Sequence, residues 1–600
     1  AGTNTVTGSV NMLTNTTYDV STGASLALTG PVSGSANLTK VGAGTLTLSG
    51  TNSYSGATNV NAGTLQLQNG AAVSDTAGAV NVALGATLQL LNNETVSSYS
   101  GAGDIGVGTN DSLLALGANT LTTTGSAAIA NVTTAAGGGI VAGGSITDTD
   151  DDNNITGPNV YLQAGTGIGT AIDPIETAVG SIQLNNTTSG VVNILNSNAG
   201  ALLTVADLRT LGFGARNLGG ALTVVNSSPM TIAANVIAAG PVVLTASDSA
   251  AAGDDLIVNP GVVIQSTGST VTLNAGDIAT IPATALVAAA GNVVINIDSG
   301  DADAGIGGTL NFAADVDAPL AIFNGLNDAN GDTFNVRPDQ DTGNVLTPIQ
   351  VFGLTPNANP NGDALVLNIS GLGIPTLTLG PGDRNGSFSF GALAAPLTYN
   401  NIENVSTNPA LPYHLVLDMR FSGYENGAAD TILARLDAAG TNLLLDVNAA
   451  NVFTGPDAVI QSLTIIGSND NDALTIQETA GGLPRFLGGA PVVNNTGVGG
   501  STSNGSHLNS SADLALETLI PGGTPWDSAD VTMHFDGGAG TDSLAVNYTT
   551  ANSTGYFSDT NDAGNSGNLS TSPGAFPALG TPTLLMSFAN IEPLTLSGAG

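Results

Sequence analysis

The sequence predicts an all-β protein, with a β-solenoid in its first half and a duplicated β-rich module in its second. Short strands of the pattern Thr-Leu-x-Leu recur about every twenty residues. Helical periodicity is missing, and glycine interrupts nearly every window of the chain. After residue 319 a longer pattern appears twice. A unit of about twenty residues is too short to fold alone, so it must stack on copies of itself.

The repeated strands begin early in the chain. Strands are expected at Ser25–Leu28, Thr45–Leu48, Thr64–Leu67 and Thr87–Leu90, with a looser copy at Ser112–Leu116. The first four strands start 20, 19 and 23 residues apart. Irregular spacing of this kind indicates that each coil keeps its strands and varies its loops.

Three segments within residues 39–67 carry a specific resemblance. They are Gly42-Ala-Gly44-Thr-Leu-Thr-Leu48, Asn52-Ser-Tyr54-Ser-Gly56-Ala-Thr58 and Val60-Asn-Ala-Gly63-Thr-Leu65. In these residues the chain resembles the autotransporter-associated β-strand repeat of bacterial surface proteins. The resemblance implies a right-handed parallel β-helix exported to the cell surface, and no enzyme activity.

The same rhythm continues to about residue 318 in different residues. The segment Asn159–Thr170, with Asp173–Thr177 after it, resembles filamentous-haemagglutinin-type surface adhesins. Later strands are expected at Ala221–Val225, Val242–Ala246, Leu256–Val258, Val271–Asn274 and Val293–Ile297. The uncharged run Ile278–Ile297 contains Pro282 and Gly291, so we interpret it as two strands and a turn, not as a membrane-spanning helix.

The second half is predicted to hold two copies of one module, residues 319–406 and 462–600, joined by a β segment at 407–461. The pattern Leu320-Ala-Ile322, Gly325, Asp332-Thr-Phe334 recurs as Leu463-Thr-Ile465, Gly467, Asp472-Ala-Leu474. These modules resemble, more loosely, extracellular repeat proteins of environmental bacteria such as planctomycetes. The pattern leaves open whether they continue the solenoid or form antiparallel sandwiches.

Composition narrows the possible partners. The 600 residues include 46 acidic and 8 basic ones, giving a net charge of −38. Nucleic-acid binding needs many lysines and arginines, so it is excluded, and an anionic membrane surface is equally unfavourable. Cysteine is absent, so no disulfide frame exists. The excess of acid has two explanations that stay open: Ca²⁺ binding, or solubility alone.

Two acidic segments are the candidate Ca²⁺ sites. Asp148, Asp150, Asp152 and Asn154 place oxygen ligands at alternate positions, which is how loops surround this ion. The segment Asp536-Gly-Gly-Ala-Gly-Thr-Asp542 resembles half of a repeats-in-toxin calcium loop. The alternatives are a solvated acidic loop at the first segment and a tight turn at the second.

These observations favour an extracellular structural protein of the bacterial surface that self-associates into a filament, sheath or surface layer, with Ca²⁺ as a stabiliser. The alternative is a monomeric adhesin stalk that binds a glycan or matrix ligand. A glycan-active enzyme is disfavoured, because the chain has one lysine, one tryptophan and no recognisable catalytic motif. No catalytic residue, organic cofactor or membrane insertion is therefore expected.

Overall fold

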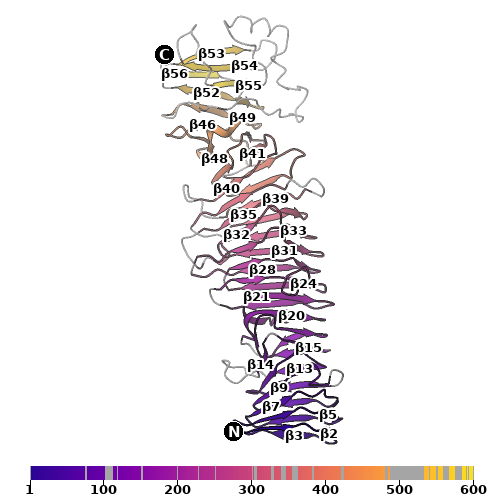
Figure 1. Ribbon diagram of the computed structural model, residues 1–600. Helices are drawn as coiled ribbons and strands as arrows, with labels where there is room; N and C mark the ends of the chain where they lie inside the picture. The colour runs from indigo at the N-terminus through magenta and orange to yellow at the C-terminus, as the bar shows by residue number, and fades with distance from the viewer. Residues whose placement is uncertain are drawn as a thin grey trace. The chain divides into compact units, whose positions relative to one another are not determined.

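The computed structural model is built almost entirely of β-strands (Figure 1). It describes all residues except 1, 75–77, 102–112, 118, 124, 150–152, 199–200, 228, 251, 301, 303–306, 326–329, 340–345, 355–361, 381–383, 421–423, 480–483, 485, 487–532, 540, 549–551, 559–566, 574–583, 590, 592–593 and 599–600. The chain forms two compact units, Ala1–Ile322 and Phe323–Gly600. Among the described residues, no helix is long and apolar enough to cross a membrane.

The first unit is a parallel β-helix whose strands stack in columns, coil upon coil. One column contains β1 (Thr3–Val6), β4 (Ser25–Leu28), β7 (Thr45–Leu48), β9 (Thr64–Leu67), β11 (Thr87–Leu90), β14 (Leu113–Gly117) and β17 (Asn131–Thr134). A second contains β3 (Thr16–Asp19), β6 (Leu38–Val41), β8 (Thr58–Val60), β10 (Ala79–Val82), β13 (Ser98–Gly101), β16 (Ala127–Ile129) and β19 (Ile146–Asp148). On the third side lie β2 (Val10–Met12), β5 (Val32–Gly34), β12 (Glu94–Val96), β15 (Thr120–Thr123) and β18 (Gly139–Ala142).

Two long strands, β20 (Ile155–Ala164) and β21 (Ile175–Asn186), lead into the next coils (Figure 1). Three parallel columns follow them. They contain β22 (Val192–Asn196), β25 (Leu222–Asn226), β28 (Val242–Ala246), β31 (Val271–Ala275) and β34 (Val293–Asn296); β23 (Leu203–Val205), β26 (Met230–Ile232), β29 (Leu256–Val258), β32 (Ile278–Ile281) and β35 (Thr309–Phe312); and β24 (Ala215–Asn217), β27 (Val236–Ala238), β30 (Val263–Ser266), β33 (Leu286–Ala289) and β36 (Asp315–Asp317). The strand β37 (Ala321–Asn324) spans the boundary between the two units.

The Thr-Leu-x-Leu strands form as the sequence predicts, and they pair in register. Leu46 pairs with Leu65, and Leu65 pairs with Leu88 in the next coil. All three side chains are fully buried, while the threonines and glutamines between them face outward. Alternate residues of a strand point to opposite faces, so one apolar set per strand is enough to build a continuous core.

The only lysine of the chain closes a turn of the matched stretch. Lys40 is fully buried, and its Nζ donates hydrogen bonds to the carbonyl oxygens of Val41, Gly42 and Ala62 at 2.9, 2.6 and 3.0 Å. Burial lowers the pKa of this ammonium, and the nearby Asp19 partly offsets the effect. At Gly63, where φ is +65°, an added Cβ would lie 2.5 Å from the carbonyl oxygen of Gly42, so only glycine fits this position.

The prediction of two strands in Ile278–Ile297 was wrong, because the run forms three strands, β32, β33 and β34. Two turn signals divide the run. The first turn begins at Pro282, and the second contains Gly291 and Asn292. Each side of the coil therefore receives its own short strand.

The second unit also stacks its strands mainly in parallel. Two series of parallel pairs are β38 (Thr333–Val336), β40 (Ala364–Leu367) and β44 (Asn404–Thr407), and β39 (Ile349–Phe352) with β43 (Leu397–Asn400). Two further series are β41 (Thr376–Leu379), β45 (Tyr413–Asp418), β49 (Ile460–Ile466), β51 (Met533–Asp536) and β55 (Leu584–Ala589), and β46 (Thr431–Leu436), β50 (Ala473–Gln477), β52 (Ser543–Tyr548) and β56 (Leu594–Gly598).

Antiparallel strands are added to these stacks locally. They are β42 (Gly386–Ser389), β47 (Asn442–Val447), β48 (Ala450–Pro456), β53 (Asn552–Ser558) and β54 (Gly567–Pro573). A short 3-10 helix, Asp457–Val459, lies between β48 and β49. Of the two alternatives for the second half, the parallel pairings match continued stacking and not a sandwich. The duplication of the module and its boundaries stay predictions.

Truncating a stacked leucine should loosen several coils. Leu65→Ala removes a fully buried side chain between Leu46 and Leu88 and is expected to cost about 2–5 kcal/mol. Circular dichroism melting, with hydrogen exchange of the amides in β7, β9 and β11, measures the effect. Gln66→Ala is the matched control, since this adjacent side chain faces outward. Equal loss of protection in both variants would contradict the assigned core.

Candidate functional site

Acidic side chains at the start of successive strands form stacks in the second unit. Asp332, Asp363 and Glu403 directly precede β38, β40 and β44, and all three are buried. The backbone N–H of Asp332 donates to Oδ1 of Asp363 at 2.8 Å, and the N–H of Asp363 donates to Oε2 of Glu403 at 2.6 Å. Each carboxylate thus accepts the N–H of the preceding coil at a turn, which would otherwise leave that donor buried and unpaired.

Asp430, Asp472 and Asp542 form a second stack of the same kind. They precede β46, β50 and β52, and each is about 1% exposed. The N–H of Asp472 donates to Oδ1 of Asp542 at 2.6 Å. Oδ2 of Asp472 accepts the N–H of Ser468 at 2.6 Å, while Oδ2 of Asp430 and of Asp542 are buried without a hydrogen-bond partner among the described residues.

The electrostatics of this stack favour a bound proton. Burial raises the pKa of Asp542 to about 6; hydrogen bonding to the Asp472 backbone opposes the shift, and the charges of Asp472 and Asp536 add to it. Burial also raises the pKa of Asp472. Like charges close together in a dry site disfavour ionisation of both groups, so the pair holds a proton more tightly than free aspartate does.

Of the predicted Ca²⁺ ligands in this region, Asp542 therefore uses one carboxylate oxygen to accept the backbone N–H of Asp472. Asp536 accepts the N–H of Gly538 through Oδ1 at 3.2 Å, which is the tight-turn alternative. Among the described residues, no group of three or more histidines, cysteines and acidic residues is arranged to hold a metal ion. Ca²⁺ binding by Asp536 and Asp542 stays a prediction.

The structure brings together two residues of the first candidate loop. Asn154 is fully buried, and its Nδ2 donates to Oδ1 of Asp148 at 2.5 Å. Asn154 also accepts the N–H of Glu176, which comes from the next coil, at 2.9 Å. Asp150 and Asp152 lie outside the described residues, so the prediction of Ca²⁺ here stays a prediction.

The sequence reasoning missed Glu176 as a member of this cluster. Burial and then the charge of Asp148 raise the pKa of its carboxyl to about 7. Glu176 lies 22 residues after Asn154, and only the pairing of β20 with β21 places it here. The available signal was that Glu176 follows the Asp148–Asn154 segment by about one coil length. Loops of varying length obscure this spacing in the sequence.

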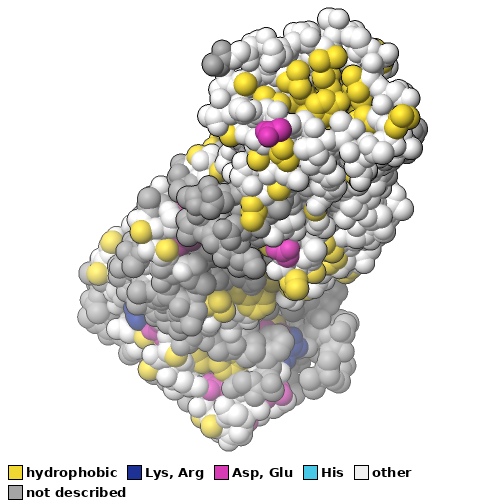
Figure 2. All heavy atoms as spheres, turned by 90° about the horizontal axis from the view of Figure 1, so that it is seen from below, with side chains coloured by type: hydrophobic (Ala, Val, Ile, Leu, Met, Phe, Trp, Pro, Cys, Tyr) yellow, Lys and Arg dark blue, Asp and Glu magenta, His cyan; other side chains and the backbone are white. Residues whose placement is uncertain are grey.

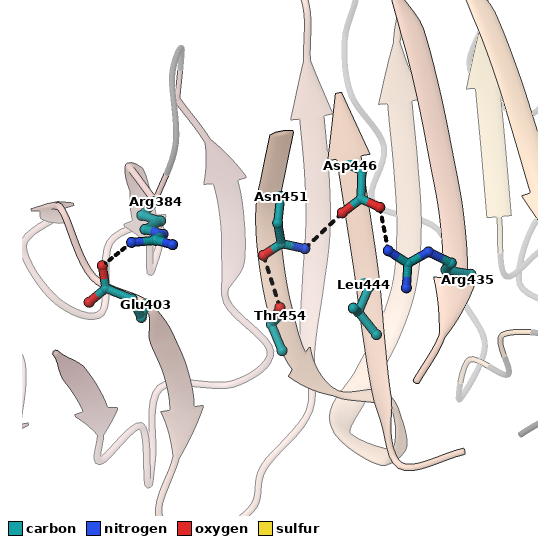
Figure 3. Close-up of a pocket in the computed structure, with 7 residues that line it drawn as sticks. All are labelled: Arg384, Glu403, Arg435, Leu444, Asp446, Asn451 and Thr454. Carbon is teal, nitrogen blue, oxygen red and sulfur yellow. Dashed lines mark hydrogen bonds and ion pairs between the residues drawn. The ribbon is translucent and has the colours of Figure 1, made fainter. Parts of the chain in front are cut away.

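A pocket of about 250 Å³ lies in the second unit (Figure 3). Arg384 pairs with Glu403 at 2.5 Å, and Arg435 pairs with Asp446 at 2.6 Å. Asn451 donates to Asp446 at 2.9 Å and, through its Oδ1, accepts the hydroxyl of Thr454 (Figure 3). Each guanidinium in the pocket is therefore already paired with a carboxylate.

One histidine contacts a serine, but the pair is not arranged for catalysis. Nδ1 of His414 lies 2.8 Å from Oγ of Ser462, and burial lowers the pKa of the imidazole. Ser462 is fully buried in β49, so a substrate carbonyl has no path to its hydroxyl. His507 lies outside the described residues.

The proton of the second stack should be visible as a pH dependence of stability. The folded-state pKa of Asp542, about 6, lies above its ordinary value of 3.8. Its stabilising effect is therefore complete below about pH 4 and is lost as the pH rises through about 6. Asp542→Asn keeps the acceptor for Asp472 and removes the titration, so it should raise the melting temperature relative to wild type more at pH 7 than at pH 4.5.

Asp437→Asn is the control for this comparison. Hydrogen bonds from the backbone of Thr441, opposed by burial and assisted by those from Asn442, hold the pKa of this carboxyl at about 2. Its effect on melting should therefore stay constant between pH 4.5 and 7. A difference for Asp542→Asn that does not change with pH would refute the bound proton.

Comparison with known proteins agrees with the strand pattern. A sequence model of the family described as Passenger-associated-transport-repeat matches residues 38–67. No curated protein and no solved structure matches the chain. The matched repeat and the stacked strands confirm the predicted resemblance: the chain is similar to the β-repeat passenger of an autotransporter, a kind of protein that is exposed at the cell surface.

Proposed function

We propose that the protein is an extracellular structural component of a bacterial surface, in which copies of the chain associate laterally. The matched passenger repeat supports the location and carries the proposal. A scaffold of stacked strands resists proteolysis, because its backbone donors and acceptors are paired from coil to coil.

The outer faces of the first unit support association between copies. Thr47 donates to Gln66, and Gln66 donates to Gln89, at 2.9 and 2.8 Å. A similar uncharged row runs from Asn296 through Asn274 to Thr245. Such faces can approach one another without the repulsion that a net charge of −38 would cause if it were spread evenly.

The acidic residues lie mainly in turns and at strand ends. In Figure 2 they are separate small groups between uncharged atoms. Ca²⁺ would lower the repulsion between such turns, within one copy or between two, and the Asp148–Asn154 loop with Glu176 is the place we favour for it.

The expected result is a Ca²⁺-dependent polymer. With millimolar Ca²⁺ the protein should sediment as ordered assemblies visible by electron microscopy, and EDTA should dissolve them. Asp148→Asn should weaken assembly at limiting Ca²⁺, whereas Glu425→Gln, which removes the same charge from an exposed residue, should not. A monomer indifferent to Ca²⁺ would favour the alternative function, an adhesin stalk.

A further inference from the structure

The basic residues of this acidic chain are mostly used inside the protein. Lys40 is buried against three carbonyl oxygens. Arg384, Arg420 and Arg435 each pair with a carboxylate within 2.6 Å. In the described part of the chain, Arg209 and Arg216 form no such ion pair. They are therefore the arginines of the first unit whose charge is left for another partner.

Arg209 lies in the loop between β23 and β24, and Arg216 lies in β24 itself. The fully buried Gln183 holds the loop, because it accepts the N–H of Arg209 at 2.8 Å and donates to the carbonyl oxygen of Phe213 at 2.8 Å. The one carboxylate of the loop, Asp207, accepts the N–H groups of Leu211 and Gly212 at 2.7 Å each. Burial acts to raise the pKa of Asp207, but these bonds and one from Gln183 lower it overall, so the carboxylate stays ionised and stabilises the loop.

Both guanidinium groups lie over aromatic rings. Arg209 Cζ is 5.2 Å from the ring centroid of Tyr161, and Arg216 Cζ is 4.4 Å from that of Phe213. Hydrogen bonds link the ring beneath Arg209 to Arg216, because Tyr161 and Asn185 both donate to Oε1 of Gln163 and Asn185 accepts from Arg216. Stacking of this kind fixes the plane of a guanidinium without using its N–H groups.

The two arginines differ in the donors that they have left. Nη2 of Arg209 donates to the hydroxyl of Thr120 and to the carbonyl oxygen of Gly137 at 2.9 and 2.6 Å. This side chain therefore links its loop to earlier coils. Arg216 donates once, through Nε to Asn185 at 3.1 Å. Its Nη groups have no hydrogen bond within the described residues, and the side chain is partly exposed. Arg216 therefore presents a free edge of its guanidinium.

Two amide side chains lie in the same strand column as Arg216. Asn185 donates to Oε1 of Gln163 at 2.9 Å, and Tyr161 donates to the same oxygen at 2.5 Å. Gln163, Asn185 and Arg216 occupy one column of three successive coils. We call Gln163, Asn185, Arg209 and Arg216 the arginine patch.

We propose that the arginine patch binds a carboxylate of an acidic, uronate-containing polysaccharide. A guanidinium edge matches a carboxylate with two parallel N–H···O bonds, and the amide NH₂ of the partly exposed Gln163 suits a sugar hydroxyl. A second copy of this chain is a weaker match, because its carboxylates lie mainly in turns and at strand ends, whereas the lateral association proposed above joins uncharged strand faces. This inference goes beyond the proposed lateral association and does not depend on it.

Isothermal titration with oligogalacturonate tests the proposal. Wild type should bind, and the affinity should fall with salt. Arg216→Gln should weaken binding by about tenfold or more, since a hydrogen bond to a charged group is lost. Methyl-esterified oligogalacturonate, which lacks the charge and keeps the hydroxyls, should not bind.

Arg420→Gln is the matched control, because it removes one positive charge from an arginine that is already paired with Asp418. It should leave the affinity unchanged, and melting curves should show that both variants are folded. Equal binding by wild type and Arg216→Gln, or binding of the esterified oligomer as tight as that of the acid, would overturn the proposal. An Arg216→Gln variant that loses self-association and keeps oligogalacturonate binding would also overturn it. If the wild type forms no polymers but binds oligogalacturonate as expected, only the proposed assembly is overturned.

Discussion

The in-register hydrogen bonding between one coil and the next is the interaction on which the rest of the structure depends. A single coil has one short strand per side, so its leucine side chains stay exposed above and below until neighbouring coils cover them. When Leu46, Leu65 and Leu88 stack, each covers the next, and the strands gain partners on both edges. This requirement fixes strand lengths and register and leaves the loops free to vary.

The acidic turns follow from the same requirement. At the start of a strand the chain turns inward, and its N–H loses water without gaining a strand partner. A carboxylate from the adjacent coil accepts that N–H in both stacks of the second unit, through Asp363 and through Asp542. Burying several carboxylates together is costly, and the raised pKa of Asp542 reflects that cost. Part of the acidity of this chain is therefore structural.

The separation of charge and strand faces connects the fold to the proposed functions. Outer strand faces carry Thr, Gln and Asn in rows, while most carboxylates lie in turns and at strand ends. The arginine patch is the exception, where a loop held by Gln183 carries Arg209 and the strand that follows it, β24, carries Arg216. Lateral association and recognition of an acidic ligand thus draw on different parts of the same scaffold.

The sequence by itself determined the class of fold and the position of the repeating strands. The alternation in Thr-Leu-x-Leu has a period of two, and only a strand buries all of its leucines on one side. The tertiary structure decided which polar residues meet. Asn154 reaches Glu176 over 22 residues, Asp472 reaches Asp542 over 70, and Arg209 reaches Thr120 over 89. These separations are sums of strand and loop lengths, and the loops vary from coil to coil. The sequence could therefore name Asp148, Asn154 and Asp542 as polar turn residues, but their partners follow only from the register of the coils.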